Sequence, residues 1–557
     1  MLAAFIGAAG GVIVHFMTAA AQLMHTLLFD VDMDQHLSAT AHVAPLRALL
    51  VPVLGGLTVG LFSLGIRRLW PRPAVDPIEA NALYGGRMSL RESIIVMLQT
   101  ILSNGVGASI GLEAGYTQMG AGVASRIGRA FRLRRNEQRL IVGCGAAAAI
   151  AAAFNGPLTG TFYAFELVIG TYTLGTFAPV VVSSIVAVSV LHALGPPPFD
   201  LTLTPPPLLP QDYAPILAVG VICALIGIAM MRAVTLLEAA LRQTGIPAWV
   251  RPALGGAAVG VLALSSPMVL SSGHGAIGMV IDTPFPAWWL GLLVVMKACA
   301  TATSIASGFR GGLFFASLFL GTLVGKFLGT ALDLIGTAHA VRATVMAVVG
   351  MSSMATAIIG GPMTMGFLAL EATGSMPLTI AVLGVCVLSA VTVRRAFGYS
   401  FATWRFHLRG EAIRSAVDVG WIRGLTVGRM MRRDVRTVRK ETPIEAVRRD
   451  FPLGSTQRLV VLDGEDRYAG IALVPEAHAA DYNGNTLANR LHNQEIMLLP
   501  QMTIKEAIAM FETAETDALA VVDGPEKRHV IGLLTEQYAL RRYSEELDRK
   551  RRELSGE

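Results

Sequence analysis

Charged residues are scarce in this chain: 15% of its 557 residues are Asp, Glu, Lys or Arg, and 7% are aromatic. Because a soluble domain carries about 25% charged residues, the composition excludes an ordinary soluble protein over most of the length. The four cysteines are far apart and have no metal-ligand spacing, so neither a disulfide framework nor a metal site is expected. The net charge of +6 is modest, and we expect no nucleic-acid partner.

The N-terminus lacks the basic start and the clear cleavage site of a signal peptide. We interpret its apolar run over residues 1–29 as a membrane helix. Because this run starts abruptly, we expect either that a short preceding segment is absent or that the chain begins later than its relatives. Further apolar segments follow at 49–65, 90–102, 141–169, 178–194, 213–230, 253–270, 286–306, 311–334, 343–370 and 378–393.

The last quarter of the chain has a different composition. Residues 421–557 hold 21 basic and 22 acidic side chains, about half of the 45 basic and 39 acidic residues in the whole chain. We therefore predict an all-α multi-pass membrane domain over residues 1–410, a linker at 411–424 and a small soluble α+β pair. The predicted modules of the pair are 425–480 and 485–557, the second including a charged tail.

Each predicted module repeats the same order of elements. A short strand comes first, then a helix that starts at Thr442 or Thr503, then two apolar strands around an Asp-Gly turn. The loop at 126–139 carries six arginines, and the positive-inside rule predicts that it is cytoplasmic. We expect the C-terminal pair on the same side of the membrane.

The apolar region contains an internal repeat. "GPLTGTFYAFE" (156–166) matches "GPMTMGFLALE" (361–371) at an offset of 205 residues, and each Gly-Pro breaks an apolar stretch. Three glycines upstream also match, at an offset of 201: Gly111, Gly120 and Gly128 with Gly312, Gly321 and Gly329. Broken helices in corresponding positions are typical of transporters, so we predict two inverted repeats, roughly 1–195 and 213–410, with a site between them.

Two kinds of carboxylate stand out in the repeat. Glu166 and Glu371 end the two Gly-Pro stretches at equivalent positions, and their symmetry favours a structural role at a helix break. Glu113 in "ASIGLEAGYTQMG" has no such partner and lies among small residues. A helix that starts there attracts an anion, so Glu113 is either a gate that competes with the anion or a satisfied structural carboxylate.

Two other functions are weighed. "GASIG" (107–111) fits the nucleophile elbow of a hydrolase, with Ser109 as the nucleophile, but a membrane helix precedes it instead of a strand. The third reading is a membrane sensor that signals through the C-terminal pair without transport.

Beyond these patterns, the chain resembles the CLC family of chloride channels and proton/chloride exchangers. "GLEAGYTQMG" is similar to the family's Gly-Arg-Glu-Gly-Pro motif, and "GGLFFASLFLGTLVG" is similar to its Gly-x-Phe-x-Pro motif. The C-terminal repeat resembles the paired CBS domains of many members. The resemblance implies a homodimer in a bacterial inner membrane, with one anion pathway in each subunit, possible coupling to protons and no enzymatic activity.

The resemblance also implies roles for individual residues. Glu113 matches the gating glutamate, and the family's anion-binding serine falls on Ala74, in "PAVDPIEANAL". A tyrosine before the last membrane helix lines the family's central site and falls on Tyr399. The implied anion-binding residues are therefore Ala74, Gly111, Leu112, Ala114, Leu313, Phe314, Phe315 and Tyr399.

The departures from the family pattern affect selectivity and coupling. Ala74 has no hydroxyl group, so the identity of the anion stays open between chloride, nitrate, fluoride and others. Leu167 stands where exchangers of the family often carry a second, inner glutamate, which leaves the usual proton route open to question. The CBS modules lack the Thr/Ser-x-x-Asp ending that binds ribose in relatives, so an adenine nucleotide is not favoured as a ligand. No other cofactor is expected.

Overall fold

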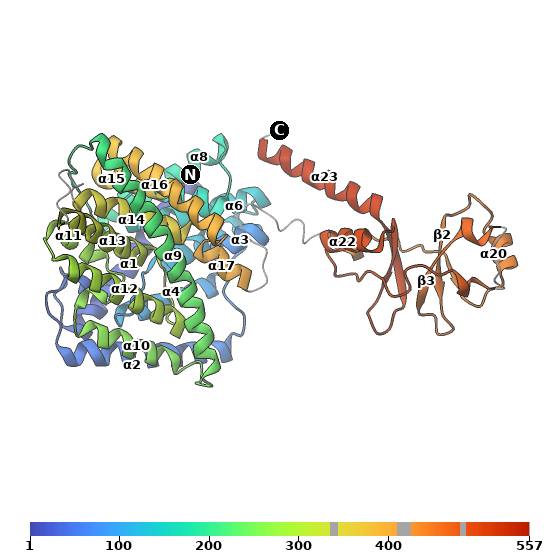
Figure 1. The fold of residues 1–557 in the computed structure, drawn as a ribbon, viewed down its shortest axis with the longest axis horizontal. Helices are drawn as coiled ribbons and strands as arrows, with labels where there is room; N and C mark the ends of the chain where they lie inside the picture. The colour runs from blue at the N-terminus through green and yellow to red at the C-terminus, as the bar shows by residue number, and fades with distance from the viewer. Residues whose placement is uncertain (335–342, 409–424, 480–485, 556–557) are drawn as a thin grey trace. The chain divides into compact units, whose positions relative to one another are not determined.

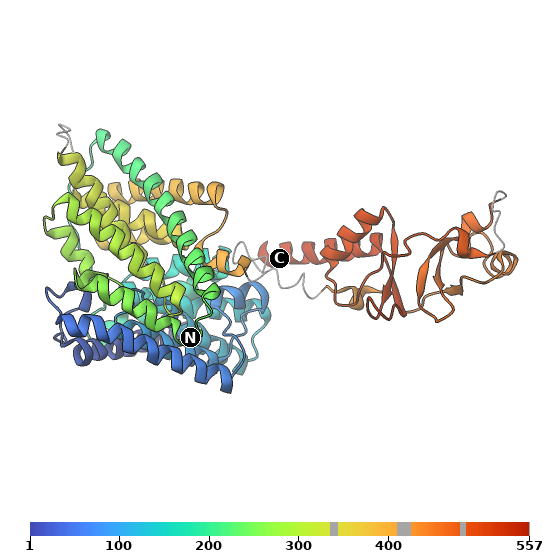
Figure 2. The same cartoon turned by 60° about the horizontal axis from the view of Figure 1, so that its bottom comes forward.

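The computed structural model describes residues 1–334, 343–408, 425–479 and 486–555, and it divides the chain into two compact units (Figures 1 and 2). The units are Met1–Asp418 and Val419–Glu557. The first is helical, and all the named strands belong to the second. The predicted linker at 411–424 lies outside the described residues.

The first unit begins with α1 (Leu2–Phe29), η1 (Leu37–Ala39), α2 (Pro45–Leu69), α3 (Pro77–Leu83), α4 (Leu90–Gly105), α5 (Glu113–Ala130), α6 (Arg135–Phe154), α7 (Pro157–Tyr163), η2 (Ala164–Ile169) and α8 (Leu174–Leu194). It continues with η3 (Pro210–Asp212), α9 (Tyr213–Gln243), α10 (Arg251–Ala263), η4 (Pro267–Val269), α11 (His274–Asp282), α12 (Ala287–Ser307), α13 (Phe314–Leu334), α14 (Ala343–Ile359), α15 (Pro362–Thr373), α16 (Met376–Ala396) and α17 (Phe401–Leu408).

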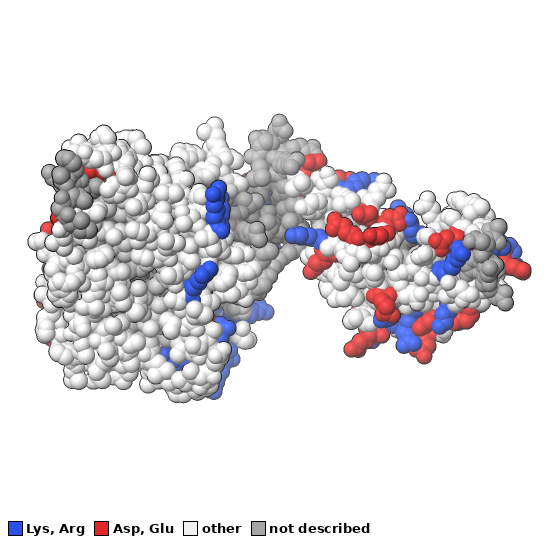
Figure 3. All heavy atoms as spheres, in the orientation of Figure 1, with Lys and Arg blue, Asp and Glu red and all other residues white. Residues whose placement is uncertain are grey.

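Within the described residues, eight helices are long and apolar enough to cross a membrane. The face of this unit seen in Figure 3 is almost free of charged side chains. Many large apolar side chains of these helices are exposed, among them Phe5, Phe16, Leu225 and Val295. Exposed apolar side chains on long helices are what a lipid environment requires.

The two Gly-Pro dipeptides break their helices as predicted. Helix α6 ends at Phe154, Asn155 takes a left-handed conformation, and α7 starts at Pro157. In the second half, α14 ends at Ile359, Gly360 has φ 92°, and α15 starts at Pro362. Proline is favourable at the first helical position because its missing N–H has no partner there anyway.

Reciprocal contacts relate the two halves. Gly111 and Gly312 form an antiparallel β-bridge, each N–H donating to the other's carbonyl at 2.9 Å. Helices α2 and α10 lie side by side (Figure 1), and a Cβ atom on Gly56 or Gly256 would meet the Pro252 or Pro52 carbonyl. These residues belong to "PVLGG" and "PALGG", which match at an offset of 200 residues. This further match of the internal repeat was not among those predicted from the sequence.

The second unit contains α19 (Val427–Met430), β1 (Thr437–Arg439), α20 (Ile444–Asp450), β2 (Arg458–Leu462), β3 (Tyr468–Leu473), α21 (Val474–Ala477), η5 (Leu487–Asn489), α22 (Ile504–Ala514), β4 (Ala518–Val522), β5 (Val530–Thr535) and α23 (Glu536–Ser555). Strand β1 pairs with β2 in parallel. Strand β2 also pairs with β3 in antiparallel fashion, and β4 pairs with β5 in the same way. The hairpins carry equivalent register shifts, at Val461/Leu462 and Val521/Val522. The predicted fold class, a polytopic helical domain followed by a small α+β pair, is confirmed.

Candidate anion site

Glu113 lies at a junction between two helix N-termini. It is the first residue of α5, and its side chain is buried, with 4% exposed. One carboxylate oxygen, Oε1, accepts a 2.6 Å hydrogen bond from the backbone N–H of Phe315, in the first turn of α13. The other, Oε2, has no hydrogen-bond partner in the described part of the chain. The carboxylate thus occupies the positive end of a helix from the other half of the molecule.

Glycine makes room for this carboxylate. A Cβ atom on Gly111 would lie 2.1 Å from Oε2 of Glu113, and one on Gly312 would lie 2.3 Å from the same atom. The β-bridge between these two glycines holds the starts of α5 and α13 together. The two glycines therefore bring the carboxylate of one half to the helix end of the other.

An aromatic cluster covers the junction. Phe154, the last residue of α6, stacks on Phe315 with ring centroids 4.2 Å apart and lies 4.4 Å from the ring of Phe314. Phe199 meets Phe315 edge to face at 5.3 Å. Because these rings exclude water, an interaction between the carboxylate and the helix end is stronger than it would be in solution.

The other predicted binding residues flank the same bridge. Leu112 precedes α5 as its N-cap residue, and Ala114 is the second residue of that helix. Leu313 directly precedes α13, and Phe314 is the first residue of that helix, the place that Glu113 holds in α5. The N–H of Gly111 donates to Gly312, so in this arrangement it is engaged by the bridge.

The other two predicted binding residues, Ala74 and Tyr399, lie in different surroundings. Ala74 lies in the loop before α3, and the carbonyl of neighbouring Val75 accepts a 2.9 Å hydrogen bond from Gln118 on α5. The loop is thus tied to the helix that starts with Glu113. The ring of Tyr399 stacks on His407 at 4.6 Å, and its hydroxyl lies 3.3 Å from Nδ1 of that residue. These contacts are with α17, and a role for Tyr399 at the anion site stays a prediction.

Tyr163 was missed by sequence reasoning. It ends α7, and its ring stacks on Phe314 with centroids 6.0 Å apart. The only available signal was its place on a broken helix, where the second half carries Leu368 instead.

Glu166 and Glu371 each cap the start of a helix in the opposite half of the molecule. The carboxylate of Glu371 accepts hydrogen bonds from the N–H groups of Leu158 (2.7 Å) and Thr159 (3.0 Å) and from the Thr159 hydroxyl (2.5 Å). Glu166 accepts the equivalent three from Met363 and Thr364, at 2.9, 2.8 and 2.6 Å. Each carboxylate thus satisfies the first turn of a helix that begins with proline.

Ser109 is engaged in packing contacts. Its side chain is fully buried, its hydroxyl lies 3.1 Å from the Thr301 hydroxyl, and its N–H donates to Ser304. In the described part of the chain, the hydrogen-bond partners of Ser109 are Thr301 and Ser304, neither a histidine nor a carboxylate. The geometry therefore does not favour the hydrolase reading.

Comparisons with known proteins identify the family. The model of the voltage-gated chloride channel family matches residues 59–394, more than half of the chain. The chain belongs to this family. A CBS-domain model matches residues 491–545, in the second predicted module.

Individual members agree with this assignment. A ClcB-like chloride channel protein of Ralstonia nicotianae is 31% identical over 372 residues, which is 64% of this chain and 85% of the relative. The voltage-gated ClC-type chloride channel ClcB of Escherichia coli is 29% identical over 384 residues, or 67% and 90% of the two chains. In fold, the chain resembles the crystal structure of a slow cyanobacterial Cl⁻/H⁺ antiporter, with a TM-score of 0.64, 20% identity and coverage of 73% and 97%.

Family membership settles the broad function. Members of the voltage-gated chloride channel family transport anions, so this chain is a multi-pass integral membrane protein that transports anions and is not an enzyme. The predicted family, fold class and transport function are confirmed. The hydrolase and sensor alternatives are not favoured.

Proposed function

We propose that this chain carries chloride across a bacterial inner membrane, as a homodimer with one pathway in each subunit, and that Glu113 gates the pathway. The observation that carries the proposal is the single 2.6 Å hydrogen bond between the Glu113 carboxylate and the Phe315 N–H. An anion has the same charge as this carboxylate and competes for the same helix end. Protonation of Glu113 removes its charge and releases the helix end to the anion.

The arrangement of arginines supports a cytoplasmic C-terminal unit. Helices α2, α5 and α16 carry arginine in their last turns, at Arg67 and Arg68, Arg129, and Arg394 and Arg395. By the positive-inside rule these three ends face the cytoplasm. The C-terminal unit follows α16 in the sequence, with the short α17 between them, and so starts from the same side.

Chloride flux from proteoliposomes tests the gate. At saturating chloride, we expect Glu113→Gln to transport chloride at a rate that no longer depends on external pH, because the neutral side chain no longer competes as an anion. The control is Glu166→Gln, a carboxylate at another helix end, which should keep the pH dependence of the wild type. If Glu113→Gln kept the wild-type pH dependence, Glu113 would not be the gate.

A pH recording in the same vesicles distinguishes the two transport modes. An imposed chloride gradient that moves protons uphill identifies a proton/chloride antiporter. A passive chloride current without proton movement identifies a gated channel. Because Ala74 has no hydroxyl, competition between chloride, nitrate and fluoride should accompany the measurement.

A further inference from the structure

A small cavity lies beside the gate and is not used in the mechanism above. Its volume is about 20 Å³, room for roughly one water-sized species. Three histidines line it, His25 from α1, His36 from the loop that follows and His274 from the start of α11. Leu112 and Phe315 of the gate junction form part of its wall.

The histidines make specific contacts. Nδ1 of His274 lies 2.6 Å from the Ser272 hydroxyl, and the rings of His36 and His274 meet edge to face with centroids 4.5 Å apart. Nε2 of His25 lies 3.0 Å from the carbonyl of Asn104. The ring of His274 also lies 5.4 Å from that of Phe315, whose N–H holds the gate carboxylate.

Acidic side chains are absent from the cavity lining. Phe315 contacts both groups, because its N–H donates to Oε1 of Glu113 and its ring lies 5.4 Å from that of His274. On α12, buried Lys297 donates to the carbonyls of Ser271 (2.8 Å) and Val269 (3.2 Å), close to the loop that holds His274. Tyr116 on α5 is hydrogen-bonded to Thr18 at 2.6 Å. Asp32 and Asp34 belong to the same loop as His36, but both are exposed and neither lines the cavity.

An imidazolium in this place requires a counter-ion. His25 is buried and His36 and His274 are partly buried, and an unpaired charge in such surroundings is costly. Two rings in contact do not both take a proton, because like charges at this distance repel. One proton on the pair, next to Lys297, is stable only when an anion enters the cavity with it. The described residues contain no group of three or more His, Cys, Asp or Glu placed to hold a metal ion.

The cavity lies on the side opposite the arginine-rich helix ends. Helix α2 starts at Pro45 and ends at Arg67 and Arg68, and His36 lies in the loop before Pro45. Loop and cavity are therefore at the outer end of the pathway, beyond Glu113.

We propose that this cavity is an outer site at which one small inorganic anion and one proton bind together, with His274 and His36 as the proton acceptors. Its place in transport rests on the proposed function of Glu113, but the binding itself does not. An anion waiting there is next to the helix end that Glu113 vacates. Acid on the outer side then raises anion occupancy of the cavity at low chloride, whereas at saturating chloride the cavity is full at any pH and the flux reports the gate alone.

The test uses the full chain in detergent with Glu113→Gln as background, so that the gate takes up no proton. Chloride is titrated into a weakly buffered sample, and both proton uptake and the apparent Kd are recorded at several pH values. We expect close to one proton for each chloride, with the apparent Kd falling about tenfold for each unit of acidification while the histidines are mostly neutral. In the same background, His274→Gln and His36→Gln should each abolish the uptake and flatten the pH dependence.

His42→Gln is the matched control, because His42 is an exposed histidine of the same loop and should leave uptake unchanged. Size-exclusion profiles identify a variant that does not fold, and the two histidine variants lie on separate elements. No proton uptake in the Glu113→Gln background overturns the proposal. Uptake that survives both histidine changes also overturns it and points to Lys297. The flux of Glu113→Gln alone tests the gate, so the two failures are distinguishable.

Discussion

Two junctions between the halves of the molecule place a carboxylate at a helix N-terminus, and they do so in different ways. At the α7–α15 junction, Glu166 and Glu371 each accept three hydrogen bonds from the opposite half. At the α5–α13 junction, the Glu113 carboxylate accepts one, on a single oxygen. Glu166 and Glu371 are therefore locked in place by three hydrogen bonds each, whereas Glu113 is held loosely by a single one.

The symmetry of the repeat explains the difference. Both halves contribute a glutamate to the α7–α15 junction, and the result is a closed, reciprocal cap. At the α5–α13 junction the offset of 201 residues pairs Glu113 with Phe314, so one half supplies a carboxylate and the other an aromatic ring. Where the symmetry holds, the carboxylates stabilise the fold. Where it fails, one carboxylate is left without a reciprocal partner and is suited to move.

Removal of a locked carboxylate should have the largest effect. We expect Glu371→Ala and Glu166→Ala to lower the free energy of unfolding by roughly 3 kcal/mol each, because three partly buried donors lose a charged acceptor. Glu113→Ala should cost less than about 1.5 kcal/mol. Thermal unfolding followed by size-exclusion chromatography in detergent measures all three. Equal losses for Glu113→Ala and Glu371→Ala would remove the distinction between the junctions.

Crowding a close helix crossing should have the next largest effect, and a similar one in both halves. A Cβ on Gly145 would lie 2.4 Å from the Gly120 carbonyl, and one on Gly350 would lie 2.3 Å from the Gly321 carbonyl. We expect Gly145→Ala and Gly350→Ala each to destabilise the fold by about 1–3 kcal/mol. Gly384→Ala is the control, because a Cβ there meets nothing within 4 Å. A large loss in one half alone would contradict the structural symmetry.

A change that displaces Glu113 without altering it should affect transport more than stability. Gly312→Ala places a Cβ 2.3 Å from Oε2 of Glu113 and leaves the backbone bridge intact. The hydrogen bond to Phe315 is worth about 1.5 kcal/mol, so its loss opens the gate roughly tenfold. Chloride flux at neutral pH should rise accordingly, with Gly384→Ala again as control. Unchanged flux with a stable protein would show that the carboxylate position does not limit transport.

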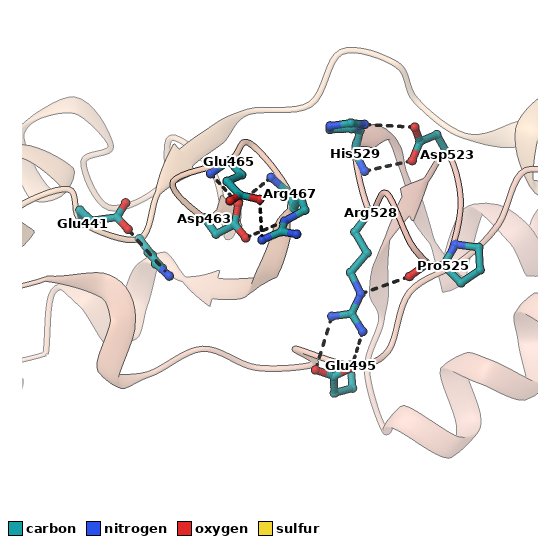
Figure 4. A network of polar contacts seen from close by, with 10 residues as sticks. Glu441, Asp463, Glu465, Arg467, Glu495, Asp523, Pro525, Arg528 and His529 are labelled. Carbon is teal, nitrogen blue, oxygen red and sulfur yellow. Dashed lines mark hydrogen bonds and ion pairs between the residues drawn. The ribbon is translucent and has the colours of Figure 1, made fainter.

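The smallest effect concerns the second unit, whose two hairpins also differ (Figure 4). Burial disfavours ionised Asp463, but two backbone N–H groups and the Arg467 side chain outweigh it and lower its pKa. The pKa of Asp523 is lowered in the same way against burial, chiefly by His529. Because both folded-state values lie below the ordinary aspartate value, their stabilisation is present at neutral pH and is lost as pH falls through the folded pKa.

Far-UV circular dichroism of the full chain during acid titration checks this prediction. Asp463→Asn should remove more of the acid-dependent loss than Asp523→Asn, since Asp463 has the additional backbone donors. Both effects should be small because these groups lie at the surface. The reverse order would contradict the difference between the hairpins.

Much of the fold followed from the sequence because its signals are local. A Gly-Pro dipeptide breaks a helix through its own backbone preferences, as at Gly156-Pro157 and at the equivalent dipeptide in the second half. The matching glutamates that follow the two dipeptides indicate the repeat. The "PVLGG" and "PALGG" match escaped notice because small residues in a membrane helix are common. Tyr163 and His274 were not singled out, because nothing in their own neighbourhoods shows what lies opposite them.

Composition and local patterns are sufficient to predict that the chain enters a membrane, that it consists of two similar halves, and that a helix begins at Glu113. These properties depend on composition, spacing and backbone preferences within a few residues. The tertiary structure alone decided which carboxylates are locked and which one is loosely held. Glu113 finds its donor 202 positions away, on Phe315. Only the packing of one half against the other sets the number of hydrogen bonds that each carboxylate receives.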